Sequence, residues 1–201
     1  MKFYYKSDWQ VKLGHFLFRI RSYTPLPFIV CALLFAKPGL FTWIAGLCLV
    51  IIGEWIRIWG VAFAGGSTRT RKVLCSNLIT TGPFGYVRNP LYLGNLILSC
   101  GLLLVSFALF PELLGLYLIF FIFQYYFIVL FEESYLNQGI GQAYIEYCIS
   151  VNRFLPRFKP FNIKSSQKPD YKSAIVSEKD TLTAIGLLLI ILVALTLIKS
   201  I

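Results

Sequence analysis

The chain is organised around residues 80–94, which read TTGPFGYVRNPLYLG. This stretch is polar at its centre and lies between two long apolar runs. Gly82-Pro83 and Asn89-Pro90 are dipeptides typical of turns, so an irregular backbone is expected here. Beside a bilayer, irregular backbone is tolerated only where protein or a water-filled cavity covers it. The stretch is therefore the first place to look for a functional site, an ordinary loop being the alternative.

The composition indicates a membrane protein. Of the 201 residues 57% are hydrophobic, and the mean hydropathy is +0.70, far above that of a soluble domain. Only 14% are charged, yet the net charge is +10. Because the Lys and Arg residues lie between apolar runs, this charge indicates membrane topology and not a nucleic-acid partner. The five cysteines form no CxxC pair and His15 is the only histidine, so neither a disulfide nor a metal site is expected.

The apolar runs predict a single all-α integral membrane domain with about five transmembrane helices, one helical hairpin and cytoplasmic amphipathic helices. The first span is the short run 22–36, and the second amphipathic helix covers 136–151, after the hairpin. In chain order we expect an interfacial helix with the first two spans (1–63), a cofactor-binding core (64–157) containing the hairpin (91–131), a linker (158–180) and a C-terminal span (181–199).

Glu54 and Arg57 stand one turn apart near the end of the long apolar run 40–63. A charge at mid-bilayer costs roughly 2.5–3.5 kcal/mol on insertion scales. The pair is therefore expected near the interface, bonded to each other or to a polar cavity. Its role is either to anchor the helix end or to take part in a functional site.

The hairpin predicts which polar residues meet. At 1.5 Å per residue each arm is about 30 Å long, the thickness of the hydrocarbon core. The second arm returns the chain to the membrane face from which the first arm started. Glu132 and Glu133 are therefore expected beside Arg88, Asn89 and Pro90.

Charge counting predicts the orientation. With five spans, one face receives residues 1–21, 57–90 and 132–180, which carry all but two of the 19 Lys and Arg residues. Such a bias places that face in the cytoplasm. The polar stretch and the glutamate pair are then cytoplasmic, the N-terminus lies inside and the C-terminus lies outside.

An ordered set of short motifs extends over residues 53–157. They are the run from Asn77 to Phe84, the run from Arg88 to Gly94, the hairpin, Glu132-Glu133, Gly141-x-x-Tyr144-x-x-Tyr147 and the closing run from Arg153 to Pro156. In this order they resemble the isoprenylcysteine carboxyl methyltransferase and phospholipid methyltransferase superfamily.

The resemblance implies an integral-membrane methyltransferase that uses S-adenosylmethionine on a lipid or other hydrophobic acceptor. The positions that it implies for cofactor binding are Ser76, Asn77, Leu78, Ile79, Thr80, Gly82, Phe84, Asn89, Pro90, Leu91, Tyr92, Glu132 and Glu133. The residues expected to carry the reaction are Arg88, Asn89, Tyr92 and Glu132. The carboxylates suit the cofactor's ammonium or ribose hydroxyls, Arg88 and Asn89 suit its carboxylate, and aromatic faces suit its sulfonium or adenine.

Two positions depart from the family pattern. Asn89 stands where the family usually has His, and it keeps a donor and an acceptor but cannot titrate. Residues 127–130 lack the Arg that isoprenylcysteine enzymes carry before the glutamates, which argues against a prenylcysteine carboxylate as acceptor. Thiol, amine, carboxylate and phospholipid head-group acceptors otherwise stay open. The alternatives are an NADPH-dependent enzyme similar to sterol reductases and a non-catalytic membrane scaffold.

Overall fold

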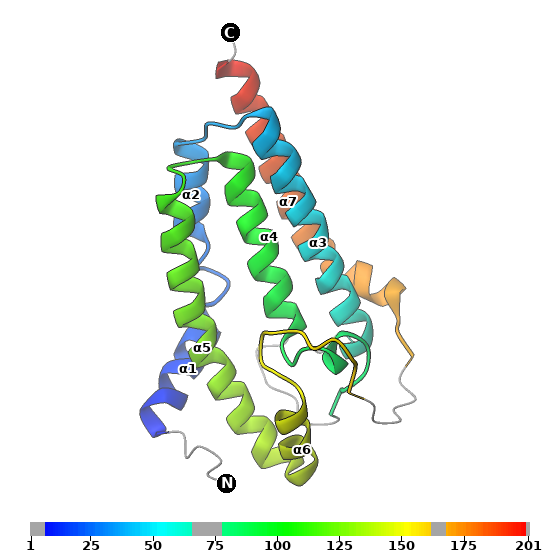
Figure 1. Cartoon of the computed structure of the whole chain (residues 1–201). Helices are drawn as coiled ribbons and strands as arrows, with labels where there is room; N and C mark the ends of the chain where they lie inside the picture. Colours follow the sequence, from blue (N-terminus) through cyan, green and yellow to red (C-terminus); the bar gives the residue numbers. More distant parts are fainter. Residues whose placement is uncertain (1–6, 66–77, 162–167, 200–201) are drawn as a thin grey trace.

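The computed structural model describes residues 7–65, 78–161 and 168–199 (Figure 1). Every regular element in these ranges is helical, which confirms the all-α prediction. The elements are α1 (Asp8–Ile20), α2 (Leu26–Leu34), α3 (Leu40–Ala64), the 3-10 helix η2 (Gly82–Gly85), α4 (Pro90–Ser106), α5 (Glu112–Ile140), α6 (Gln142–Ser150) and α7 (Tyr171–Lys199).

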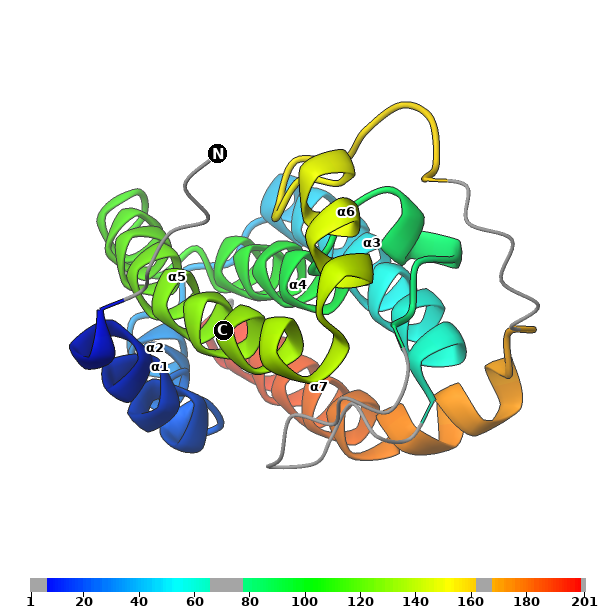
Figure 2. The ribbon, with the colours of Figure 1, turned by 90° about the horizontal axis from the view of Figure 1, so that it is seen from below.

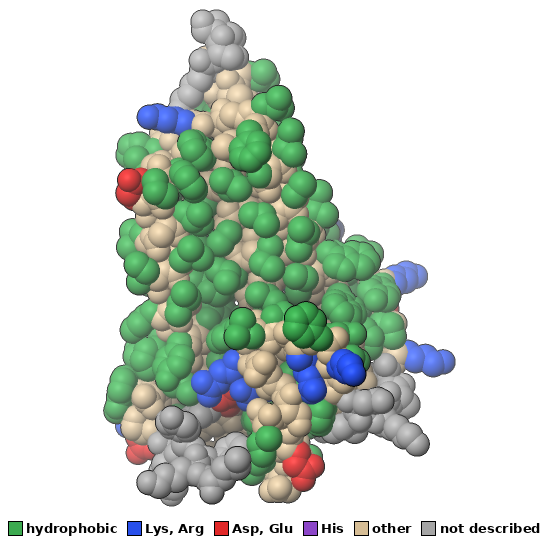
Figure 3. All heavy atoms as spheres, in the orientation of Figure 1, with side chains coloured by type: hydrophobic (Ala, Val, Ile, Leu, Met, Phe, Trp, Pro, Cys, Tyr) green, Lys and Arg blue, Asp and Glu red, His purple; other side chains and the backbone are tan. Residues whose placement is uncertain are grey.

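Helices α3, α5 and α7 are long and apolar enough to cross a membrane, and α4 is a shorter apolar helix. Large hydrophobic side chains on their outer faces are exposed, among them Phe41, Trp55, Ile119 and Ile190. In Figure 3 hydrophobic side chains cover the shaft of the bundle, while Lys and Arg side chains gather toward the lower end. This surface suits a lipid environment along the shaft.

The elements run back and forth between the two ends of the bundle. In Figure 1, α1 and α6 lie at the lower end, α2 joins α3 at the upper end, and the two termini lie at opposite ends. The predicted hairpin is confirmed, since α4 rises to the upper end and α5 returns from it. Pro90 is the first residue of α4, where its missing N–H costs nothing. Residues 91–94, expected in the irregular stretch, are therefore already helical.

The close packing of α3 against α4 depends on glycines at matching heights. A Cβ atom on Gly53 would lie 2.8 Å from the Gly94 carbonyl oxygen, and one on Gly46 would lie 2.7 Å from that of Gly101. Such small residues let two backbones approach closely, which is how helices associate where no hydrophobic driving force acts. The seven-residue spacing of these glycines in each helix fixes the rotation of α4 and hence the direction of Tyr92 and Asn95.

The prediction that residues 22–36 form one membrane-spanning helix is wrong. The helix predicted before this span is confirmed as α1, which packs Leu17 and Phe18 against α5, while its place at the membrane interface stays a prediction. The chain then turns through residues 21–25, and α2 has only nine residues. Nine residues rise about 14 Å, too short to cross the core alone.

The second predicted amphipathic helix is also corrected. Helix α5 does not end at Phe131 but continues through Glu132 and Glu133 to Ile140. The break comes at Gly141, which has a φ of +72°. Glycine adopts this left-handed region without the steric cost of a Cβ atom. Only the short α6 therefore lies across the lower end of the bundle, as Figure 2 shows.

The expected linker 158–180 is wrong in its second half, because α7 begins at Tyr171 and not at Thr181. Asp170 starts this helix: its side chain accepts a 3.0 Å hydrogen bond from the Ser173 backbone N–H, and its own N–H donates to Ala62 in α3. The first turns of α7 then bury Ala174 and Glu178 against the bundle. Contacts with α3 thus stabilise a helix over residues 171–180, although their sequence is polar.

Candidate functional site

Tyr92 and Glu132 form a direct contact between the two arms of the hairpin. The Tyr92 hydroxyl donates a hydrogen bond of 2.5 Å to Glu132 Oε1. The Tyr92 ring lies 4.6 Å from the ring of Tyr125, two turns before Glu132 on α5. The first turn of α4 thus faces the last part of α5 that lies within the bundle. The hairpin therefore brings Glu132 next to the first turn of α4, as its geometry predicts.

Glu133 is held by two arginines. Arg153 donates from Nε and Nη2 to its two oxygens at 2.8 and 2.7 Å, and Arg88 Nη1 lies 3.0 Å from Oε1. The fork geometry of a guanidinium matches a carboxylate in this way, and the shared ion pair is largely buried, since only 8% of Glu133 is exposed. The hydrogen bonds to Glu133 raise the pKa of Arg153, so its guanidinium group stays charged. These three side chains carry a net positive charge.

Arg88 keeps donor capacity beyond this pair. Its backbone N–H donates to the Asn152 carbonyl at 2.9 Å, and Nη1 also reaches the Cys148 sulfur. Its Nε is buried, and within the described ranges nothing accepts a hydrogen bond from it; the same holds for the Thr81 hydroxyl. A buried donor left without an acceptor costs about 1–3 kcal/mol, and such groups are often completed by a ligand.

Asn89 binds backbone and not the glutamates. Its Nδ2 donates at 3.1 Å to the carbonyl oxygen of Arg153, the residue whose side chain holds Glu133. A neutral amide suffices for this contact, which needs one donor and no titration. Asn89 therefore fixes the position of Arg153 from the far side of the loop.

The segment that follows α6 lies along the 3-10 helix. Backbone N–H groups of Arg157 and Phe161 donate to Tyr86 and Gly85, at 3.0 and 2.8 Å. From α6, the Tyr147 hydroxyl donates to the Phe84 carbonyl at 2.7 Å. Burial raises the pKa of Tyr147, so this hydroxyl stays protonated and keeps its donor. The irregular stretch is therefore covered by protein, as its place beside a membrane requires.

The other predicted cofactor residues fall into three groups. Leu78 packs with Tyr144 and Tyr147, and Thr80 is buried next to the 3-10 helix. Leu91 packs against Val61, Ala62 and Ala174, away from the glutamates, while Gly82 has a φ of +59° and touches the Phe63 ring, so both have structural roles. Ile79 is half-buried, whereas Ser76 and Asn77 lie outside the described residues.

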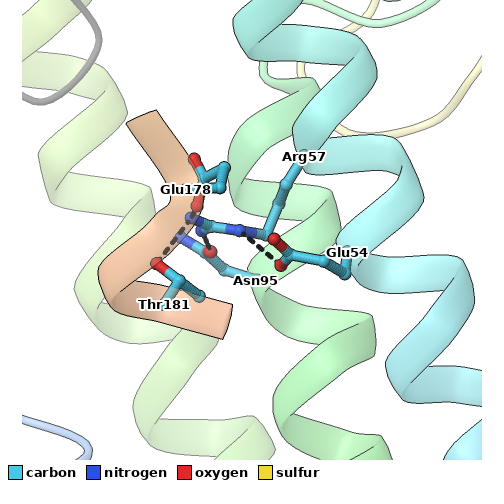
Figure 4. A network of polar contacts seen from close by, with 5 residues as sticks. All are labelled: Glu54, Arg57, Asn95, Glu178 and Thr181. Carbon is cyan, nitrogen blue, oxygen red and sulfur yellow. Dashed lines mark hydrogen bonds and ion pairs between the residues drawn. The ribbon is translucent and has the colours of Figure 1, made fainter. Parts of the chain in front are cut away.

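The sequence did not reveal a second polar cluster. Arg57 binds Glu54 at 3.1 Å, and it also binds Asn95 in α4 and Glu178 in α7 (Figure 4). The Glu54–Arg57 pair was expected, but Glu178 stands in the predicted linker. Asn95 also interacts with Tyr125, whose ring contacts that of Tyr92, so this cluster connects through Tyr92 to Glu132. A glutamate within one turn of an apolar span was the only sequence signal for this partner.

Arg153 was also missed as a site residue, although it belongs to the closing motif. Its distance of 20 positions from Glu133 gives no periodic signal. Only the sharp turn at Gly141 folds α6 and the following segment back toward α5.

The fold and the site together define a class: a helical membrane protein with a cluster of acidic, basic and aromatic side chains at one end of the bundle. The family model of phospholipid methyltransferases matches residues 41–143, about half of the chain. The chain belongs to this family and is a membrane methyltransferase. This confirms the family resemblance. Neither the curated proteins nor the solved structures contain a significant match.

Proposed function

We propose that this protein transfers a methyl group from S-adenosylmethionine to a lipid or other hydrophobic acceptor at the cluster formed by Arg88, Tyr92, Glu132, Glu133 and Arg153. The observation that carries the proposal is the different surroundings of two neighbouring carboxylates. Glu133 is neutralised by two arginines, whereas Glu132 accepts only the Tyr92 hydroxyl among the described residues. The pair thereby separates a negative position from a positive one.

This separation fits the charges of the cofactor. S-adenosylmethionine carries an ammonium group, a carboxylate and a sulfonium, and the sulfonium supplies the methyl group. Glu132 offers its second oxygen to an ammonium or a ribose hydroxyl. The unpaired Nε of Arg88 and the net positive charge around Glu133 suit the carboxylate. The Tyr92 ring offers a π face to a cation.

The residues act by positioning. In methyl transfer the methyl–sulfur bond breaks with its electron pair remaining on sulfur, while a lone pair of the acceptor forms the new bond. In-line alignment and exclusion of water supply most of the assistance. The Tyr92–Glu132 hydrogen bond fixes both side chains on rigid helices, and the segment that follows α6 covers the loop on the other side. Asn89 contributes by holding Arg153.

The charge bias supports a cytoplasmic site. The lower end in Figure 3 carries most of the visible Lys and Arg side chains, in line with the positive-inside rule. A cofactor from the cytosol then reaches the loop, while the acceptor arrives along the bilayer.

Titration of the purified protein with S-adenosylmethionine tests the proposal. Glu132→Gln and Tyr92→Phe each remove one partner of the buried bond, so affinity should fall about 10- to 100-fold, as expected for a charge-assisted hydrogen bond of about 1.5–3 kcal/mol. Glu146→Gln is the matched control, since this exposed glutamate on α6 bonds only to Gln142 within the described ranges.

The two alternatives give different results in the same titration. Binding of NADPH without S-adenosylmethionine would contradict the proposal and favour a reductase-like enzyme. Binding of neither cofactor would favour a scaffold. Family membership supports the methyl donor over the nicotinamide.

A further inference from the structure

A third polar group lies where α1 is followed by α2. The Arg21 guanidinium lies 3.7 Å from the centroid of the Phe18 ring, and Nη1 donates to the Phe18 carbonyl at 3.0 Å. No carboxylate of the described segments forms an ion pair with it. Arg21 therefore holds a positive charge against an aromatic face without a counter-ion from these segments.

This charge faces the proposed reaction centre. The Phe18 ring lies 5.6 Å from that of Phe131, the residue before Glu132. Tyr92 and Tyr125 pack in the same cluster as Phe18. Arg21 also interacts electrostatically with Glu132 and with both tyrosines. Helices α1 and α6 lie on opposite sides of α5 (Figures 1 and 2). Arg21 directly follows α1, so it belongs to the side of α5 opposite to α6.

Gln124 supplies a second unused donor at this place. Its side chain is buried, with 2% exposed, and Oε1 accepts a 3.1 Å hydrogen bond from the Thr24 hydroxyl. That hydroxyl also lies 3.0 Å from the Arg21 carbonyl oxygen, which ties Gln124 to the turn between α1 and α2. The Nε2 atom of Gln124 is buried and has no acceptor in the described part of the chain. A ligand atom that accepts a hydrogen bond from Nε2 would remove the free-energy cost of leaving this buried donor unpaired.

An apolar cavity begins at the next residue of the same turn. Pro25 and Ala32 line one wall, Leu103 in α4 and Leu192 in α7 line others, and the volume is about 60 Å³. A cavity of about 150 Å³ takes a benzene ring, so this one admits only a short segment of an aliphatic chain and no ring system. The outer faces of Tyr23 and Leu26 are exposed, 61% and 51%, at the surface where lipid would lie.

We propose that Arg21 and Gln124 Nε2 bind the anionic head group, a carboxylate or a phosphate, of a lipid acceptor whose aliphatic chain enters the cavity next to Pro25. The proposal rests on the proposed function, because it places the acceptor at Glu132 and Tyr92. Arg88 and Arg153 already flank Glu133, so the second substrate must reach the reaction centre from another side. The turn between α1 and α2 is the side that borders lipid. It carries the cation Arg21, and its Thr24 bonds to Gln124 of α5, which supplies the free donor.

Binding of simple amphiphiles to the purified full chain in neutral detergent tests the subsite. The probes are dodecyl phosphate, dodecanoate, dodecanol and inorganic phosphate. At least one of dodecyl phosphate and dodecanoate should bind more tightly than dodecanol, which lacks the anionic group. The same amphiphile should also bind more tightly than inorganic phosphate, which lacks the aliphatic chain. Arg21→Gln and Gln124→Leu should each weaken binding of that anionic amphiphile about tenfold, with S-adenosylmethionine affinity unchanged.

Arg19→Gln is the matched control, because Arg19 is an exposed arginine in the last turn of α1, and the substitution should leave all affinities unchanged. Arg21→Lys keeps the charge and should restore part of the affinity. If Arg21→Gln fails to fold, Gln124→Leu still tests the site, since it removes the unpaired Nε2 atom. It also removes the oxygen that accepts from Thr24, whose hydroxyl keeps the Arg21 carbonyl as a partner.

Several results would overturn the proposal. Inorganic phosphate binding as tightly as dodecyl phosphate would show a site for a soluble anion. Loss of S-adenosylmethionine affinity in Arg21→Gln would assign Arg21 to the cofactor. Unchanged amphiphile affinity in both variants would contradict the subsite alone. Arg21-dependent binding in a protein that binds no S-adenosylmethionine would instead contradict the acceptor role together with the proposed function.

Discussion

The guanidinium of Arg57 in α3 binds the carboxylate of Glu178 in α7, and the two side chains lie inside the helical bundle (Figure 4). Only 1% of Glu178 is exposed. Because no water reaches this carboxylate, its charge must be compensated by protein. The contact therefore fixes the beginning of α7 against α3 and, through Asn95, against α4.

Glu178→Ala should destabilise the protein by about 3 kcal/mol, the low end of the range for breaking a buried ion pair, since Glu54 still faces Arg57. The midpoint of thermal unfolding in detergent measures the effect. Lys179→Ala is the control at an exposed neighbour and should change the midpoint little. The Arg57→Met, Glu178→Met double variant should lose less than the sum of the single variants, and strict additivity would show that the contact contributes no coupling.

Gly53→Ala should destabilise the protein by about 1–3 kcal/mol, because the added Cβ would meet the Leu98 backbone nitrogen at 2.5 Å and force α3 away from α4. Gly115→Ala is the matched control. Nothing lies within 4 Å of a Cβ at Gly115, so the same substitution on α5 should be neutral or stabilising. Equal unfolding midpoints for the two variants would contradict the close packing of α3 and α4.

Arg153→Lys should weaken S-adenosylmethionine binding about tenfold, because a lysine cannot reproduce the two parallel bonds to Glu133. Isothermal titration measures the affinity. Arg157→Lys is the control, since Arg157 Nη1 donates only to the Ser150 carbonyl. An Arg153→Lys protein that binds as tightly as the wild type would mean that the fork has no part in holding the cofactor.

We expect the Cys148 thiol to make the protein less stable at alkaline pH. Burial raises the pKa of Cys148, although the nearby Arg88 acts in the opposite direction. In the unfolded chain a thiol ionises near about pH 8.5, so above that pH the unfolded state binds fewer protons and stability falls as pH rises. Below that pH Cys148 contributes no such slope.

Cys148→Ala should therefore reduce the fall of the unfolding midpoint between about pH 8.5 and 10. Cys48→Ala, at an exposed cysteine of α3, is the control and should keep the wild-type slope. The same slope in all three proteins would show that Cys148 titrates alike in the folded and unfolded states.

The orientation predicts the location of the C-terminus. From the positive-inside bias we expect Arg88 and Glu133 in the cytoplasm and the end of α7 on the other side. A reporter fused after Ile201 should therefore be extracytoplasmic, and one inserted beside Gly141 should be cytoplasmic. A cytoplasmic signal from the C-terminal reporter would contradict an arrangement in which the two chain ends lie on opposite faces of the membrane.

The sequence predicted the parts of the site that follow from local rules. Apolar runs of membrane length, separated by Pro111-Glu112, require a hairpin, and a hairpin returns Glu132 to the level of Tyr92. The motif order pointed to the family that residues 41–143 confirm. The roles assigned to Arg88, Asn89, Tyr92 and Glu132 in catalysis stay predictions.

The errors share one cause, which is that a helix boundary depends on partners far away in the sequence. Residues 171–180 read as a polar linker, yet they are helical because Arg57 and Ala62 in α3 bind Glu178 and Asp170. The predicted helix after the glutamates was displaced because α5 continues until Gly141 permits a break. Periodicity detects an amphipathic face but not the point at which packing stops supporting it.

The sequence by itself determined that this chain is a helical membrane protein with its polar residues at one end, since hydrophobicity, length and charge act locally. The tertiary structure alone decided that Glu132 faces Tyr92 while Glu133 is held by Arg88 and Arg153. Two adjacent residues on one helix differ in direction by about 100°, so their partners depend on which segments pack on each side. Because of these different surroundings, Glu132 forms the negative side of the candidate site, and Glu133 with its two arginines forms the positive side.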